Sequence, residues 1–159
     1  MDPIFSDLTK SLGVFLITGL AIGFSTFLGL RYISAIGGFT NTFQLEATAI
    51  VVIVAISAFF LSPAISALTG LYIGYKEPES SRTFAFSTFA AFVGFFLLNT
   101  VSVGVLLFLL GENLVPATSS DPSTVLYSFL LLENSAAYHS FPSIIIAPIA
   151  AYLGSGVNE

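Results

Sequence analysis

The segment that decides the fold is TFAFSTFAAFVGFFLLNTVSVGVLLFLLG, residues 83–111, which contains no charged residue between Arg82 and Glu112. About 20 consecutive apolar residues are enough for an α-helix to cross the hydrocarbon layer of a membrane. Because the segment is longer than that minimum, it predicts a transmembrane helix with room to tilt.

A second uncharged run, residues 47–75, precedes this segment and is bounded by Glu46 and Lys76. It predicts another transmembrane helix with a kink at Pro63, because proline removes a backbone donor and clashes with the preceding turn. A short polar stretch, residues 76–82, joins the two runs. We therefore expect the two helices to form an antiparallel hairpin.

A third uncharged run, residues 11–30, lies near the start of the chain between Lys10 and Arg31. The residues before it include Asp2 and Asp7, and no small-residue cleavage site follows it. A signal peptide has a basic start and such a cleavage site, so we expect this run to stay in the protein as a transmembrane helix.

The last apolar region, residues 134–158, lacks Asp, Glu, Lys and Arg but is interrupted by Pro142 and Pro148. Its most hydrophobic part, residues 141–153, is short for a complete crossing. An apolar block upstream predicts a helix at 122–133, because an Asp-Pro-Ser sequence is a typical helix start. That helix is either interfacial or the first part of one broken fourth span.

Together these runs predict an all-α fold, a polytopic membrane helix bundle with four transmembrane helices in a single domain, residues 1–159. The spans are expected at about 11–31, 47–75, 83–111 and 136–154, with the interfacial helix at 122–133 before the fourth. The composition agrees, because 55% of the residues are hydrophobic and 8% are charged, whereas soluble domains carry about 25% charged residues.

The basic residues indicate how the bundle is oriented in the cell membrane. With four spans, Lys10, Lys76 and Arg82 lie on the same side as both termini, and Arg31 lies on the other side. Because positively charged loops tend to stay in the cytoplasm, we expect both termini to be cytoplasmic.

The charge balance and the missing cysteines exclude several kinds of partner and site. The formal net charge is −5, which disfavours nucleic acid and anionic lipid as partners. The chain has no cysteine, so disulfides and thiolate metal sites are excluded, and we expect no cofactor. Acidic, lysine-poor loops would suit a proteome at high salt, which leads to the hypothesis of a halophilic archaeal source.

Small residues one turn apart form the clearest motifs in the predicted spans. Such pairs let two helix backbones approach closely inside a membrane. We interpret them as packing faces within one bundle; the alternative is an interface with another copy or with a larger membrane complex. The predicted packing residues are Gly19, Gly23, Gly70, Gly74, Ala90, Gly94, Ala147 and Ala151.

Polar side chains inside the spans are the remaining candidates for function. Asn99 predicts a hydrogen bond to a neighbouring helix, because a free amide is costly in lipid. Alternatively, Asn99 lines a pathway together with Ser62 and Ser66 around the kink at Pro63. His139 has no second nitrogen or sulfur ligand nearby in the sequence, so we expect an interfacial residue and no metal site.

No catalytic motif is visible in the sequence, and spans one to three contain no Asp, Glu, Lys or Arg. Ion-coupled transporters and intramembrane hydrolases usually have such residues inside the membrane. The sequence therefore favours a non-enzymatic membrane subunit or scaffold that packs with itself or with another membrane protein. The alternative is a homo-oligomeric channel or a transporter of small solutes.

Overall fold

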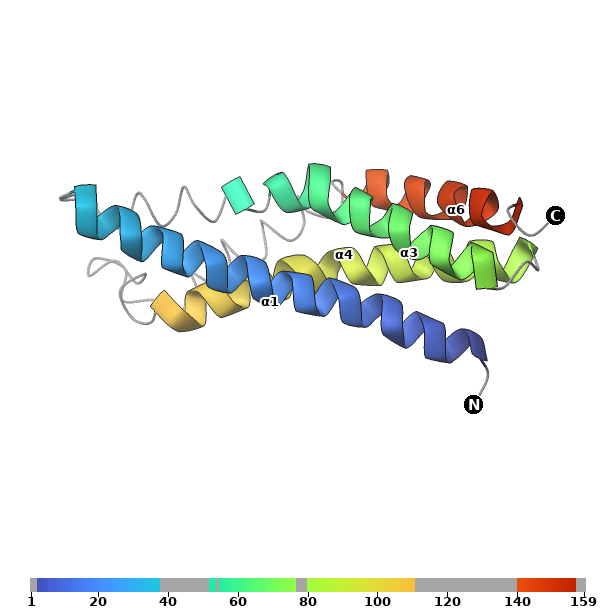
Figure 1. The fold of residues 1–159 in the computed structure, drawn as a ribbon, viewed down its shortest axis with the longest axis horizontal. Coiled ribbons are helices and arrows are strands. Elements are labelled where there is room, and N and C mark those ends of the chain that lie inside the picture. The colour runs from blue at the N-terminus through green and yellow to red at the C-terminus, as the bar shows by residue number, and fades with distance from the viewer. Residues whose placement is uncertain (1–2, 38–51, 54, 77–79, 111–139, 157–159) are drawn as a thin grey trace, which may run out of the picture.

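The computed structural model describes residues 3–37, 52–53, 55–76, 80–110 and 140–156. All regular structure in these ranges is helical, which confirms the predicted all-α fold (Figure 1). The four α-helices are α1 (Pro3–Gly37), α3 (Ser62–Lys76), α4 (Ser80–Leu110) and α6 (Phe141–Ser155). A π-helical turn, η1 (Ser57–Leu61), directly precedes α3.

Two of the four helices are long and apolar enough to cross a membrane, judged by length and composition alone. They are the segments Ser6–Ile36 of α1 and Arg82–Leu110 of α4. The helices α3 and α6 have 15 residues each, fewer than the roughly 20 that a complete crossing requires. Of the four predicted spans, only two therefore meet this criterion in the part of the chain that the structure describes.

The helix boundaries differ from the uncharged runs at several points. The helix α1 continues past Lys10 at one end and past Arg31 at the other, because charged side chains at the surface do not stop a helix. The helix α4 begins before Arg82. The predicted interfacial helix at 122–133 and His139 lie outside the described residues.

Prolines shape the starts of the two shorter helices. Pro63 is the second residue of α3, and the backbone N–H of Ser62 donates to the carbonyl of Ser57 across the π-helical turn. The helix changes from π-helical to α-helical hydrogen bonding at this point, inside a continuous helical stretch where proline removes one backbone donor. Pro142, in contrast, lies in the first turn of α6, where proline is tolerated, and α6 continues through Pro148 without ending.

Consecutive helices run in opposite directions, but the closest packing joins helices that are not consecutive (Figure 1). The helix α1 packs parallel to α4, and α3 packs parallel to α6. The helix α4 also contacts α3 and α6, whereas α1 approaches α3 much less. The start of α1 and the end of α6 lie at the same end of the bundle (Figure 1).

Small and hydroxyl-bearing residues fill much of the interior, and large apolar side chains cover the outside. One apolar cluster joins three helices through Phe15, Ile65 and Leu98. A second cluster lies near the end of α4 and consists of Leu30, Ile53, Leu106 and Leu110. The first cluster thus joins α1, α3 and α4, and the second joins α1 and α4 to Ile53, which precedes η1.

Candidate functional site

The interface between α3 and α6 is formed where the backbones touch. A Cβ atom on Gly70 would overlap the carbonyl oxygen of Ala147 and lie 3.2 Å from its Cα. A Cβ atom on Gly74 would lie 2.8 Å from the Cα of Ala151 and overlap its oxygen. Four of the predicted packing residues therefore meet in one interface, in which neither glycine can carry a side chain without moving a helix.

The interface between α1 and α4 repeats this arrangement with a different partner. A Cβ atom on Gly19 would lie 2.8 Å from the carbonyl oxygen of Leu98, and one on Gly23 would lie 2.5 Å from that of Ser102. In helical geometry, glycines four residues apart lie on one face. This face of α1 is therefore occupied by α4 within the chain itself.

The predicted pair Ala90 and Gly94 lies on α4, where both residues face the interior. Ala90 is fully buried, and a Cβ atom on Gly94 would lie 2.7 Å from the ring carbon Cγ of Phe15. The glycine thus makes room for an aromatic ring of α1. The sequence did not indicate Phe15 as the partner, because 17 phenylalanines are distributed along the chain.

The segments η1, α3, α4 and α6 each contribute buried polar residues, and we call this set the polar layer: Ser57, Ser62, Ser66, Asn99 and Ser143. The Ser143 hydroxyl donates to Oγ of Ser62 over 2.9 Å, joining α6 to α3. The side-chain amide of Asn99 donates over 2.9 Å to the carbonyl of Phe95, which belongs to the same helix.

Three polar atoms of this layer have no hydrogen-bond partner among the described residues. They are Oγ of Ser57, Oγ of Ser66 and Oδ1 of Asn99, and all three residues are more than nine-tenths buried. The hydrogen bond predicted for Asn99 to a neighbouring helix is not among the bonds of the described residues, since its amide bonds within α4.

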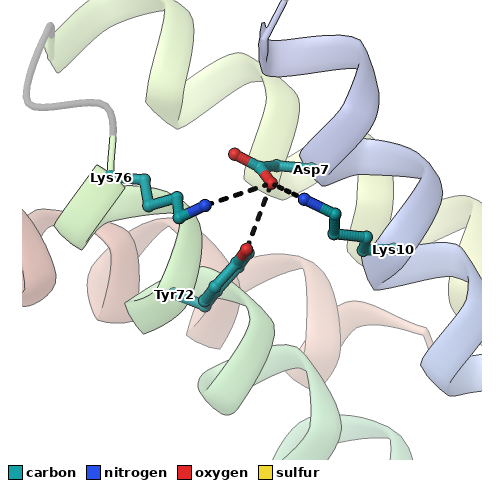
Figure 2. Close-up of polar contacts among 4 residues, drawn as sticks. All are labelled: Asp7, Lys10, Tyr72 and Lys76. Atoms are coloured by element: carbon teal, nitrogen blue, oxygen red, sulfur yellow. Dashed lines mark hydrogen bonds and ion pairs between the residues drawn. The ribbon is translucent and has the colours of Figure 1, made fainter.

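Near the end of α3, a cluster of charged and polar side chains joins α1 to α3 (Figure 2). We call this cluster the Asp7 clip, and it consists of Asp7, Lys10, Tyr72 and Lys76. Lys10 donates to Oδ1 of Asp7 over 2.9 Å, and the Tyr72 hydroxyl donates to the same oxygen over 3.1 Å. The ammonium nitrogen of Lys76 lies 3.8 Å from that oxygen. One nearly buried carboxylate therefore connects two helices.

The ionisation of the clip follows from its hydrogen bonds. The bond from Lys10 lowers the pKa of Asp7, although burial opposes this shift, and the bond from Tyr72 lowers it further. The hydrogen bond between Lys10 and Asp7 also raises the pKa of Lys10. Both residues precede the uncharged segment 11–30, which is the part of α1 that the sequence predicts as a membrane span.

Sequence reasoning did not identify the Asp7 clip. In the sequence, Asp7 argues only against a signal peptide, whereas Lys10 and Lys76 bound the first and second uncharged runs. The available signal was the spacing of Tyr72 and Lys76, which lie on one face at positions i and i+4. That spacing does not specify which other helix faces them.

The described residues contain no group of three His, Asp or Glu side chains that could hold a metal ion. Comparison with models of protein families, with curated proteins and with solved structures found no match. The site offers close backbone packing, buried hydroxyls, and one carboxylate that accepts two hydrogen bonds and lies near the ammonium of Lys76.

Proposed function

We propose that this chain is an integral membrane protein in which all four helices cross the bilayer, and that it serves as a non-enzymatic subunit or scaffold of a membrane complex. The distribution of side chains supports this proposal more than any other feature. Buried positions hold serines, and the outside carries apolar side chains that are at least two-thirds exposed, among them Ile17, Phe60, Leu68, Phe108 and Tyr152. Soluble monomers rarely expose so much apolar surface.

The two shorter helices can cross together with the longer ones. Residues 55–76 are helical without a break through η1 and α3, and 22 helical residues rise about 33 Å, enough for the hydrocarbon layer. The helix α6 rises only about 22 Å, but it packs along α3. We therefore place α6 at the same depth in the membrane as α3.

The orientation proposed for the bundle has both termini in the cytoplasm. Lys10, Lys76 and Arg82 belong to the start of α1, the end of α3 and the start of α4, which lie at one end of the bundle (Figure 1). Positively charged segments favour the cytoplasmic side. A reporter fused to the C-terminus should be protected from proteases added outside intact cells.

The non-enzymatic role is supported by the chemistry of the interior. Apart from Asp7, the buried polar side chains in the described ranges are serines, threonines and one asparagine. General acid–base chemistry needs a group that can exchange a proton near neutral pH, and a hydroxyl or an amide cannot do so. We therefore infer that the interior serves packing.

A pull-down from native membranes in mild detergent tests the subunit proposal. The proposal expects a second membrane protein in a fixed ratio to this chain. Because Gly19, Gly23, Gly70 and Gly74 already pack inside the chain, a partner should contact the outer apolar surface. Recovery of this chain alone, as a monomer, would contradict both the proposed role as a subunit and the formation of a homo-oligomer.

The second candidate is a channel or a transporter of small neutral solutes, and the polar layer is the observation that favours it. Its hydroxyls and the amide of Asn99 could line a path if the helices separate. Flux of a small solute into vesicles containing the purified protein tests this candidate. Flux that disappears in Asn99→Leu would support it, and equal leakage from protein-free vesicles would exclude it.

A further inference from the structure

Tyrosine and basic side chains gather near the ends of the bundle in the described residues, and we divide them into two belts. The first belt consists of Lys10, Tyr72, Tyr75, Lys76 and Tyr152, and the second belt consists of Arg31 and Tyr32. Every described tyrosine thus belongs to a belt, and each is at least 38% exposed. Arg82, at the start of α4, lies at the same end of the bundle as the first belt (Figure 1).

Contacts between helices bring the first belt to one level. The Asp7 clip joins the start of α1 to the end of α3 at this level. A Cβ atom on Gly154 would lie 3.1 Å from the backbone nitrogen of Tyr75, and Tyr152 precedes Gly154 by two residues. The exposed Tyr152 of α6 is therefore level with Tyr75 of α3.

The second belt lies at the opposite end of α1. Arg31 and Tyr32 follow Leu30, which packs in one cluster with Leu110, the last residue of α4. The guanidinium carbon of Arg31 lies 5.3 Å from the centre of the Phe27 ring. The cation of this belt is therefore held against apolar surface.

Both kinds of side chain favour the boundary between hydrocarbon and lipid headgroups. Tyrosine has an apolar ring and a polar hydroxyl, and it is enriched at membrane interfaces. Lysine and arginine lay their stems along apolar surface and keep their charge in the polar region. A belt of such residues fits the headgroup region of a leaflet better than it fits the hydrocarbon.

The separation of the two belts agrees with the thickness of the hydrocarbon layer. Arg31 follows Lys10 by 21 residues within the continuous helix α1, a rise of about 32 Å, and the hydrocarbon layer is about 30 Å thick. Between these two residues α1 has no charged residue, and its exposed surface includes Ile17, Leu20 and Phe24.

We propose that the first belt binds the headgroup region of one leaflet and the second belt that of the other, so that the hydrocarbon layer extends along α1 from Lys10 to Arg31. The inference rests on the proposed function, and it adds the depth of each helix in the bilayer.

The two belts also assign a depth to the start of α6. Phe141 precedes Tyr152 by 11 residues, so it lies about 17 Å along the helix from the first belt. This is about half of the hydrocarbon thickness. The fourth crossing proposed above therefore also uses residues before Ser140, which lie outside the described residues.

Single tryptophans in the full chain measure these depths, because the natural chain has none. Tyr152→Trp and Tyr32→Trp place the probe in the two belts, and Phe141→Trp places it at the proposed middle of the layer. The matched control is Leu20→Trp, midway along the segment of α1 between the belts. All four replaced side chains are at least 45% exposed, so the substitutions leave the packed interior unchanged.

The purified variants are reconstituted into phosphatidylcholine vesicles whose lipid chains carry bromine either close to the headgroup or close to the chain end. The shallow bromine should reduce the fluorescence of Tyr152→Trp and Tyr32→Trp more than the deep bromine does. The order should be reversed for Phe141→Trp and Leu20→Trp.

Stronger quenching by the deep bromine in either belt variant, or by the shallow bromine in Phe141→Trp, would overturn the proposed boundaries. Deep quenching of Leu20→Trp in the same experiment would still support the proposed membrane protein. Absence of quenching in all four variants would contradict the membrane placement itself and, with it, the proposed function.

Discussion

The backbone of Gly74 in α3 rests directly on the carbonyl group of Ala151 in α6. A Cβ atom at position 74 would lie 2.7 Å from the carbonyl carbon of Ala151 and overlap its oxygen. Backbone atoms cannot move aside as a flexible side chain can. The separation of the two helices is therefore set by the missing side chain at Gly74.

Replacing Gly74 with alanine should destabilise the protein by about 1–3 kcal/mol, the usual cost of forcing an extra carbon into a packed interior. Thermal unfolding in detergent measures the change. The matched control is Gly104→Ala, because a Cβ atom at position 104 would meet no atom within 4 Å. The control should gain about 0.5–1 kcal/mol from the higher helix propensity of alanine. Equal effects at both positions would contradict the interface.

A disulfide should form between α3 and α6 in the double variant Ser62→Cys and Ser143→Cys. The two hydroxyl oxygens are 2.9 Å apart, close to the geometry that a disulfide needs, and the natural chain has no cysteine that could compete. Mild oxidation followed by mass spectrometry of a proteolytic digest detects the bond. The control pair, Ser62→Cys with Ser155→Cys, places one cysteine about 18 Å farther along α6 and should remain reduced.

The exposed face of α1 should not tolerate a charge near its middle if α1 crosses the membrane. Ile17 is 67% exposed, so Ile17→Lys removes no internal contact in a water-soluble protein. In a bilayer, a central lysine costs about 2.5–3.5 kcal/mol on insertion scales, and the protein should be depleted from the membrane fraction. Tyr32→Lys is the control at the end of the helix, next to Arg31, and should insert normally.

Removing the carboxylate of the Asp7 clip should loosen the contact between α1 and α3. Asp7→Ala leaves the Tyr72 hydroxyl without its acceptor and should cost about 1.5–3 kcal/mol, the range for hydrogen bonds to charged groups. Lys10→Met should cost less, because its side chain is 57% exposed and solvent screens an exposed ion pair. Chemical unfolding measures both variants, and a larger loss in Lys10→Met would contradict the geometry.

The same clip should make stability depend on pH in the acidic range. The pKa of folded Asp7 is lowered from its usual value of 3.8, so the folded state favours the ionised carboxylate. The resulting stabilisation is present above about pH 4 and is lost as the pH falls through the lowered pKa. The stability difference between the natural protein and Asp7→Asn should therefore shrink in that range. A stability difference that does not change with pH would show that the charge of Asp7 does not stabilise the folded protein.

The existence and type of the helices could be predicted from the sequence, because uncharged runs and their flanking charges are local features. Which helices pack against each other could not be predicted from the sequence. Gly19 and Gly70 mark faces that accept a close neighbour, but a glycine does not identify the residue that will touch it. The contacts with Leu98 and Ala147 depend on how the whole bundle closes.

The same limit explains the Asp7 clip and η1. Asp7 has the sequence features of a flanking charge, and its burial results from the approach of Tyr72 across 65 positions. Pro63 signals an irregularity in the second run, but the sequence does not specify whether the helix kinks, ends or adds the π-helical turn that precedes α3. The sequence around Pro63 therefore predicts where the helix is irregular but not which helix type it adopts there.

The pairing of α1 with α4 has a consequence for how the protein is made. The glycine face of α1 finds its partner 79 positions later in the chain, as Gly19 does with Leu98. At about 5–20 residues per second, the ribosome needs on the order of 4–16 s to synthesise that interval. If α1 crosses the membrane as proposed, it persists in the bilayer during this time with its glycine face unmatched. The docking of α1 on α4 then follows the proposed insertion of α1 and waits for the synthesis of α4.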